Sequence, residues 1–296
     1  MSYGEKDSLE RHGYILGKLL GSGAYGKVMK ATYRGKDSGP RLTVATKTIN
    51  TSKLPALYIE KFLPRELEVV RWLDHPNVVR AHSIVYRRGI VYIFMEFVEN
   101  GTLLKYLKNN KKLSEAKCQI WFRQILGGLL YLHRNKHAHR DVKCDNVLIT
   151  KQYNLKVCDF GFARLIVDRK GSCITSTTYC GTPSYCPPEI LEGVPYYPTL
   201  ADAWSTGVTL YVLMCQSMPF GSKDTRLVLR EQKQARWKFT AFVDKNFSKD
   251  SRNVVSAMLV ADPQKRANLF KISRHKWLST ANTKALVRSA VKKQQH

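Results

Sequence analysis

The sequence is poor in acidic residues and has no long apolar run. Its 296 residues include 23 acidic and 49 basic side chains, which gives a formal net charge of +26. The longest apolar stretch, residues 208–215, is far too short to cross a bilayer. Residues 1–13 are polar and resemble no signal peptide, and Ser2 does not fit the myristoylation pattern. We therefore expect no membrane span and a location in the cytoplasm or the nucleus.

Cysteine pairs and zinc-ligand spacings are also missing. The 7 cysteines form no Cys-x-x-Cys pair and have no histidines at zinc-ligand spacing. An odd number of scattered cysteines indicates free thiols in a reducing compartment. No motif that reads DNA or RNA bases occurs. The positive charge is therefore expected to attract acidic partners, and no sequence-specific nucleic acid.

A glycine-rich segment lies near the amino terminus between two predicted strands, residues 14–20 and 28–33. Its residues are Gly21, Ser22, Gly23, Ala24, Tyr25 and Gly26, followed by Val28. Glycines let a backbone approach phosphate groups that side chains would keep away. A dinucleotide-binding fold uses the same spacing, but a helix should then follow. A plain hairpin turn is the structural alternative. Strand, glycines and strand together favour a nucleotide-covering loop.

A lysine inside the next predicted strand needs a charged partner. Lys47 lies within the apolar residues 43–49, where an unpaired ammonium would be costly. Residues 59–73 read as an amphipathic helix that carries Glu66 and Glu68. These two side chains point about 200° apart on a helix, so only one can face inward. Glu66 lies next to the apolar side, and we expect it to pair with Lys47, whose other side faces phosphates.

The most informative residues are His139-Arg140-Asp141-Val142-Lys143-Cys144-Asp145-Asn146, followed by Asp159-Phe160-Gly161. Asp141 can accept a proton from a hydroxyl, and Lys143 can stabilise a transferring phosphoryl group. Asn146 and Asp159 supply oxygen atoms for a cation. His139 is expected to be a scaffold residue. One chemistry uses all of these parts, namely phosphoryl transfer from ATP with Mg²⁺, or alternatively Mn²⁺, to a protein hydroxyl.

An extended linker follows the predicted strand at residues 90–95. Its backbone N–H and C=O groups could hydrogen-bond adenine. The nucleotide contacts expected here and on neighbouring strands are Ala45, Met95, Glu96, Val98 and Leu148.

A loop rich in serine and threonine lies between Asp159 and Glu189. Arg140 and Arg164 supply cations there, and a phosphate on Thr178 would satisfy both and order the loop. The phosphate would come from an upstream kinase or from autophosphorylation in trans. The alternative is a loop that is ordered without modification. Thr182 is expected to bond Asp141 and Lys143.

Three further residues have expected structural roles. Asp202 should be a buried acid that braces the backbone around His139, and Arg266 should pair with Glu189. The basic tail, residues 278–296, is either disordered or a short helix.

These motifs span residues 14–277 and resemble the eukaryotic protein kinase superfamily, with Lys143 typical of its serine/threonine branch. The runs Lys61-Phe62-Leu63-Pro64-Arg65-Glu66, Asp159-Phe160-Gly161-Phe162 and Ser217-Met218-Pro219-Phe220 resemble the testis-specific serine/threonine kinases. The resemblance implies a bilobal α+β fold in which a small β-rich N-lobe with one main helix precedes a larger, mainly helical C-lobe. The expected parts are an N-terminal extension at 1–13, the N-lobe at about 14–95, a hinge at about 96–101, the C-lobe at about 102–277 and the tail.

The resemblance also implies protein substrates, a monomer and a role in male germ-cell differentiation. Pro187 replaces the usual alanine before Pro188-Glu189, and Thr102 stands where many relatives have a glutamate that reads substrate arginine. Glu99 and Asp145 could substitute for that glutamate. The alternative from another functional class is a catalytically silent scaffold that binds acidic partners.

Overall fold

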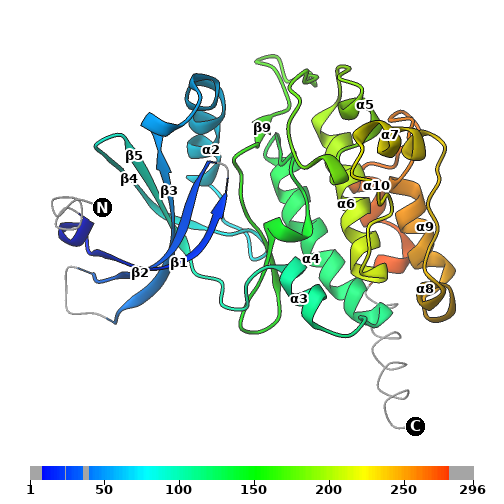
Figure 1. The fold of residues 1–296 in the computed structure, drawn as a ribbon, viewed down its shortest axis with the longest axis horizontal. Helices are drawn as coiled ribbons and strands as arrows, with labels where there is room; N and C mark the ends of the chain where they lie inside the picture. Colours follow the sequence, from blue (N-terminus) through cyan, green and yellow to red (C-terminus); the bar gives the residue numbers. More distant parts are fainter. Residues whose placement is uncertain (1–8, 24, 36–39, 280–296) are drawn as a thin grey trace, which may run out of the picture. The chain divides into compact units, whose positions relative to one another are not determined.

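The computed structural model describes residues 9–23, 25–35 and 40–279. The chain forms two compact units that divide between Glu99 and Asn100 (Figure 1). The first is built on a β-sheet and the second is mainly helical, so the predicted bilobal α+β class is confirmed. The predicted loop residue Ala24 and residues 280–296 of the basic tail lie outside the described residues.

The first unit contains a five-stranded antiparallel sheet with the strand order β1-β2-β3-β5-β4. The strands are β1 (Tyr14–Gly23), β2 (Gly26–Tyr33), β3 (Leu42–Asn50), β4 (Ala81–Arg87) and β5 (Ile90–Glu96). All but β4 match strands predicted from the sequence. β4 pairs with a single neighbour at the edge of the sheet, and no residue in it is fully buried. Its hydrophobic pattern is correspondingly weak.

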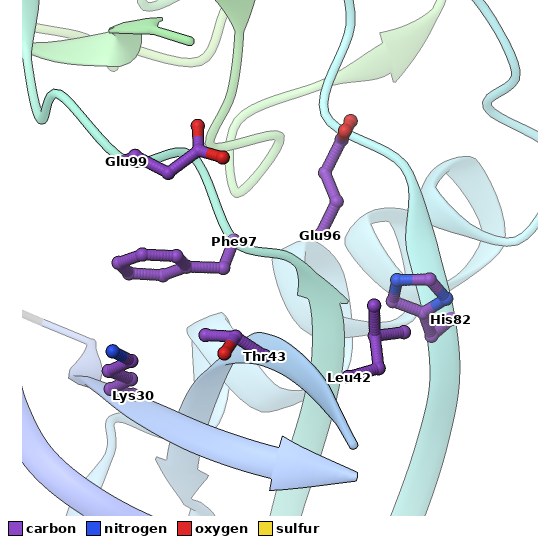
Figure 2. A pocket seen from close by; sticks show the side chains of 7 residues that line it. All are labelled: Lys30, Leu42, Thr43, His82, Glu96, Phe97 and Glu99. Carbon is purple, nitrogen blue, oxygen red and sulfur yellow. The ribbon is translucent and has the colours of Figure 1, made fainter. Parts of the chain in front are cut away.

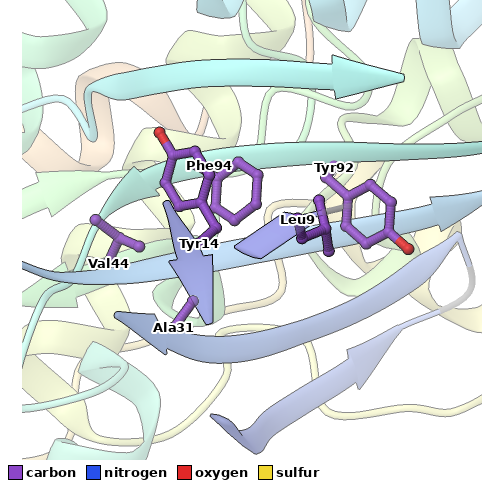
Figure 3. Packing of buried hydrophobic residues seen from close by; sticks show 6 residues of the cluster. All are labelled: Leu9, Tyr14, Ala31, Val44, Tyr92 and Phe94. Atoms are coloured by element: carbon purple, nitrogen blue, oxygen red, sulfur yellow. The ribbon is translucent and has the colours of Figure 1, made fainter. Parts of the chain in front are cut away.

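A hydrophobic cluster on this sheet includes a residue from the segment before β1 (Figure 3). Tyr14 stacks on Phe94 with ring centres 3.5 Å apart, and its hydroxyl lies 2.7 Å from Ser83 Oγ. Burial raises the pKa of Tyr14 above its ordinary value. Leu9, from the segment before β1, is 2% exposed in the same cluster. Part of the expected N-terminal extension therefore contributes to the core of the first unit.

The helix predicted over residues 59–73 is shorter and begins irregularly. A π-helical turn, η2 (Tyr58–Phe62), leads into α2 (Leu63–Val70), after the 3-10 turn η1 (Thr51–Lys53). Pro64 lies in the first turn of α2. Its ring would clash with the carbonyl one turn earlier, so a regular α-helix cannot run through this point. The wider π turn, closed by Leu63 N–H donating to Tyr58 O, accommodates it.

Two long helices, α4 (Glu115–Arg134) and α6 (Pro198–Cys215), pack against each other in the second unit (Figure 1). The sequence predicts a long helix over residues 114–134, and α4 agrees with this range within one residue. Ser114 caps its first turn by accepting a hydrogen bond from Lys117 N. The sequence predicts a helix that starts at Asp202, and α6 begins four residues earlier, because Pro198 is well suited to a first helical position. α6 is apolar on almost every side and is buried along nearly its whole length.

The remaining elements of the second unit surround these helices. The helices are α3 (Leu103–Asn109), α5 (Pro188–Leu191), α7 (Thr225–Lys233), α8 (Ala241–Asn246), α9 (Lys249–Met258) and α10 (Leu269–Ser273). The 3-10 turns are η3 (Cys144–Asn146), η4 (Pro183–Tyr185) and η5 (Lys276–Leu278). Two short antiparallel pairs join β6 (His137–Ala138) to β9 (Arg164–Leu165) and β7 (Val147–Ile149) to β8 (Leu155–Val157). These pairs fix the loops that carry the candidate catalytic residues.

Within the described part of the chain, no helix combines the length and apolar character needed to cross a membrane. All seven cysteines are free thiols.

Candidate active site

The glycine-rich segment forms a tight hairpin between β1 and β2. Gly23 is paired with Gly26, and Gly21 with Val28. A Cβ on Gly26 would lie 2.4 Å from Thr48 O, so the fold itself requires this glycine. A Cβ on Gly21 or Gly23 would meet no atom within 4 Å. Neither packing nor a left-handed backbone explains these two glycines, and the open space fits a ligand that approaches the backbone closely.

Four predicted nucleotide contacts share one face of this sheet. Val28 lies opposite Lys47, and Ala45 lies opposite Met95. Directly opposed residues of antiparallel strands point to the same side, and residues two apart on one strand do so as well. The apolar side chains of Val28, Ala45 and Met95 therefore lie on the same face of the sheet as the ammonium of Lys47. This arrangement suits a flat aromatic base beside a charged phosphate group.

Lys47 is held by the carboxylate of Glu66. The Nζ atom of Lys47 lies 2.6 Å from Glu66 Oε1, and Glu66 is 2% exposed. Tyr58 donates its hydroxyl to Glu66 Oε2 at 3.1 Å. The Tyr58 ring also stacks on Tyr25 of the glycine segment, with ring centres 4.3 Å apart. Glu68, the alternative partner for Lys47, is exposed.

Tyr58 is a site residue that the sequence analysis missed. It links the glycine segment to the Lys47–Glu66 pair through one stacked ring and one hydrogen bond. The signal in the sequence is limited to its position eight residues before Glu66. The π turn that brings the two side chains together cannot be predicted from the α-helical period of 3.6 residues per turn.

A separate cavity of about 440 Å³ lies at the end of β5 (Figure 2). Of the predicted nucleotide contacts, only Glu96 lines it. The Glu96 carboxylate accepts a hydrogen bond from Arg80 N at 2.8 Å, and its own N–H donates to Arg80 O at 3.0 Å. The N–H of Glu96 is therefore engaged with the chain beside β4 and does not serve as a donor to adenine. Val98 is buried, and Leu148 lies in β7 of the second unit.

In the second unit, three side chains hold the carboxylate of Asp141. Lys143 Nζ lies 2.8 Å from Oδ2, and Asn146 Nδ2 donates to Oδ2 at 2.9 Å. Thr182 donates its hydroxyl to Oδ1 at 2.8 Å and accepts a hydrogen bond from Lys143 Nζ at 2.6 Å. Asp141 itself is 5% exposed. A buried carboxylate with fixed orientation and a neighbouring ammonium is suited to receiving a proton beside developing negative charge.

The backbone on both sides of Asp141 is shaped for this arrangement. Arg140 has a φ of 66°. Gly181, next to Thr182, has a φ of 97°, and a Cβ there would lie 2.7 Å from Arg140 O. A side chain at position 181 would therefore be strained and would push the two segments apart. The close approach allows Thr182 to reach Asp141.

Asp202 holds the backbone of the two residues before Asp141 by hydrogen bonds. Its carboxylate accepts hydrogen bonds from His139 N at 2.9 Å and from Arg140 N at 2.7 Å. Its Oδ2 also lies 2.8 Å from His133 Nε2. Complete burial by itself would raise the pKa of Asp202, but the hydrogen bond and charge of His133, together with the His139 N–H, keep that pKa below its ordinary value. Asp202 therefore remains ionised and fixes two backbone N–H groups.

His139 joins the loop around Asp141 to the segment around Asp159. Its Nδ1 accepts a hydrogen bond from Asp141 N at 3.2 Å, so Nε2 carries the hydrogen and donates to Cys158 O at 3.0 Å. Its ring also packs edge to face with the ring of Phe160, with ring centres 5.4 Å apart. These contacts give His139 a positioning function with no free nitrogen for proton transfer.

Asn146 and Asp159 are brought together by the β7–β8 pair. Cys158 N donates to Asn146 O at 2.9 Å, directly before Asp159. The side-chain hydrogen bonds of Asn146 to Asp141 both use its Nδ2, so its side-chain carbonyl oxygen is the end suited to bind a cation. Asp159 adds a carboxylate and has a φ of 62°. An amide oxygen and a carboxylate are hard oxygen donors, which fit Mg²⁺ or Mn²⁺.

A cluster of buried polar groups surrounds Arg140. Its Nη1 donates to Ser176 Oγ at 3.2 Å and to Tyr196 OH at 3.3 Å, and its Nε donates to Phe162 O. Its Nη2 is buried without a hydrogen-bond partner among the described residues. Thr178 is attached to the same cluster, because its N–H donates to Ser176 Oγ and its carbonyl accepts from Tyr196 OH at 3.0 Å.

Burial raises the pKa of Tyr196 to about 12, so its hydroxyl keeps the proton that it donates. Ser176 and Tyr196 are contacts of Arg140 that sequence reasoning missed, since nothing local marks them. Arg164 lies in β9, where its backbone pairs with Ala138.

Glu189, in α5, and Arg266 form a buried ion pair. The guanidinium donates to the two carboxylate oxygens at 2.6 and 2.8 Å. It also donates to three carbonyls and lies 5.0 Å from the centre of the Trp204 ring. The replacement of the usual alanine by Pro187 leaves this pair in place.

Comparison with known proteins agrees with this geometry. Residues 14–278 match the family described as "Protein kinase domain". The chain is 35% identical to mouse testis-specific serine/threonine-protein kinase 2 over 97% of this chain and 79% of that protein. It is 38% identical to human testis-specific serine/threonine-protein kinase 1 over 91% and 72% of the two chains. It is also 35% identical to the Arabidopsis thaliana SNF1-related protein kinase catalytic subunit alpha KIN12, over 90% of this chain and 51% of that protein.

Proposed function

Since the chain belongs to the protein kinase family and is a serine/threonine kinase, we propose that it transfers the γ-phosphate of ATP to serine and threonine hydroxyls of protein substrates. The observation that carries the proposal is the Asp141 carboxylate held by Lys143, Thr182 and Asn146. A scaffold has no need for a fixed, buried carboxylate with a lysine beside it. The silent-scaffold alternative is therefore not favoured.

The roles follow from the contacts. Asp141 orients the acceptor hydroxyl and accepts its proton through Oδ1 or Oδ2. Lys143 Nζ, 2.8 Å from that carboxylate, stabilises the negative charge that develops on the transferred group. Thr182 fixes both side chains by bonding each of them. Deprotonation thus takes place beside a fixed positive charge.

The nucleotide and metal contacts are assigned on the same grounds. Lys47, oriented by Glu66, is the ammonium for the α- and β-phosphates, beneath the glycine segment at residues 21–26. Asn146 and Asp159 would hold Mg²⁺, or alternatively Mn²⁺. A metal ion held there would neutralise negative charge on the phosphates.

Phosphorylation of Thr178 is proposed as the activating event. The support is the unpartnered, buried Nη2 of Arg140, a cation within the cluster to which Thr178 is already attached. A phosphate would supply strong acceptors for that nitrogen. Thr178→Ala should reduce the phosphate transfer rate severalfold or more, whereas the exposed neighbour Thr177→Ala should not. Wild-type rates from Thr178→Ala, in a protein whose wild type carries the phosphate, would contradict the proposal.

The biological setting is proposed from the relatives. Several similar proteins are named testis-specific kinases, and we infer a role in male germ-cell differentiation. The free thiols suit a reducing compartment, so the proposed location is the cytoplasm or the nucleus. Loss of the protein should therefore impair spermatid development, and normal sperm from animals lacking it would argue against this setting.

A further inference from the structure

A groove of about 610 Å³ lies where α3 ends and α4 begins. Three lysines line it, namely Lys111, Lys112 and Lys117. No carboxylate among the described residues lies within ion-pair distance of these three ammonium groups. The groove is therefore positively charged, and that charge is not compensated by the part of the chain that the structure describes.

The acidic residue nearest in sequence is turned away from the groove. Glu115 lies between the lysines in sequence, but it is 9% exposed. Its carboxylate accepts hydrogen bonds from Ser248 N and from Trp277 Nε1, both at 2.9 Å. It is committed to holding α9 and η5 against α4. The fold thus directs the carboxylate of Glu115 into the interior, where it does not neutralise the groove.

Aromatic rings hold two of the lysines in place. Lys112 Nζ lies 4.7 Å from the centre of the Phe242 ring, and Lys117 Nζ lies 4.5 Å from the Trp121 ring. Ring faces attract an ammonium but leave its full charge in place. The positive charges therefore keep defined positions, which reduces the conformational entropy that a ligand must remove on binding.

We propose that this groove binds an acidic peptide segment of a protein partner. Carboxylates would pair with the lysines, and the hydroxyl of Tyr106 and the amide of Asn109 could hydrogen-bond the peptide main chain. The volume lies in the usual range for specific pockets, about 300–1,000 Å³. The proposal concerns binding and does not depend on phosphoryl transfer.

The test is fluorescence anisotropy with the full chain and a labelled oligoglutamate peptide. The variant Lys111→Glu with Lys112→Glu reverses two exposed charges and should leave the fold intact. Its matched control is Lys223→Glu with Lys271→Glu, two exposed lysines outside the groove. We expect the groove variant to bind about tenfold more weakly or worse, because two attractive contacts become repulsive. The control should bind within about twofold of wild type.

Three results would overturn the proposal. Equal loss in both variants would assign the affinity to the net charge of the chain, and no loss in the groove variant would exclude the groove. Tighter groove-dependent binding of anionic vesicles or duplex DNA than of the peptide would replace the peptide with another occupant. Equal circular dichroism and melting of the two variants shows that any difference in binding comes from the groove.

Discussion

The buried pair of Glu189 and Arg266 allows a stability prediction with a worked magnitude. The Arg266 side chain is fully buried and that of Glu189 is 7% exposed, and they share two charged hydrogen bonds. Removing one partner of such a pair costs about 3–5 kcal/mol. Glu189→Gln keeps one acceptor oxygen, and the Arg266 guanidinium still donates hydrogen bonds to three backbone carbonyls. We therefore expect the lower end of that range, about 3 kcal/mol.

This loss is a large part of the stability of a typical domain, about 5–15 kcal/mol. For a unit of this size, each kcal/mol lowers the melting temperature by about 2–4 °C. Differential scanning calorimetry should therefore show a fall of about 6–12 °C for Glu189→Gln. The matched control is Glu192→Gln, which breaks the partly exposed pair with Lys233 just beyond the same helix. That pair should contribute about 1 kcal/mol or less.

A melting temperature for Glu189→Gln that equals that of Glu192→Gln would refute the reasoning. A double substitution, Glu189→Met with Arg266→Met, separates the pair from the cost of leaving one charge unpaired. It should destabilise the protein less than the sum of the two single changes, because neither charge is then left buried alone.

Two predictions concern the site itself. Glu66→Gln removes the negative charge that orients Lys47 and should lower kcat/KM for ATP at least about tenfold. The exposed control, Glu68→Gln, should not lower it. Equal kcat/KM values for both variants would contradict the role of the Lys47–Glu66 pair. Thr182→Val removes the hydroxyl that bonds Asp141 and should lower kcat about tenfold to a hundredfold, whereas Thr182→Ser should stay near wild type. Steady-state kinetics of the folded variants test both predictions. Equal kcat values for Thr182→Val and Thr182→Ser would contradict the prediction for Thr182.

Much of the architecture could be predicted because it depends on local periodicity. Four strands of the sheet and α4 follow from alternating or helical hydrophobic patterns. The choice of Glu66 over Glu68 follows from the same periodicity, and in the structure the first is buried against Lys47 while the second is exposed.

What sequence reasoning missed depends on contacts between distant segments or on irregular backbone. Tyr58 reaches Glu66 only because a π turn precedes Pro64. Ser176 and Tyr196 meet Arg140 through folding of a loop without secondary-structure periodicity. The carboxylate of Glu115 is buried where it accepts a hydrogen bond from Trp277, which lies 162 residues away in the sequence. No pattern within a window of one helix or strand contains such information.

The most direct test of the central claim is transfer of labelled phosphate from ATP and Mg²⁺ to a generic protein substrate. The comparison is between wild type, Asp141→Asn and the control Asp74→Asn, which changes a side chain that is 73% exposed. Wild type and the control should transfer phosphate, and Asp141→Asn should be slower by about a hundredfold or more. Equal transfer by Asp141→Asn and wild type, or no transfer by wild type carrying phosphate on Thr178, would contradict the account.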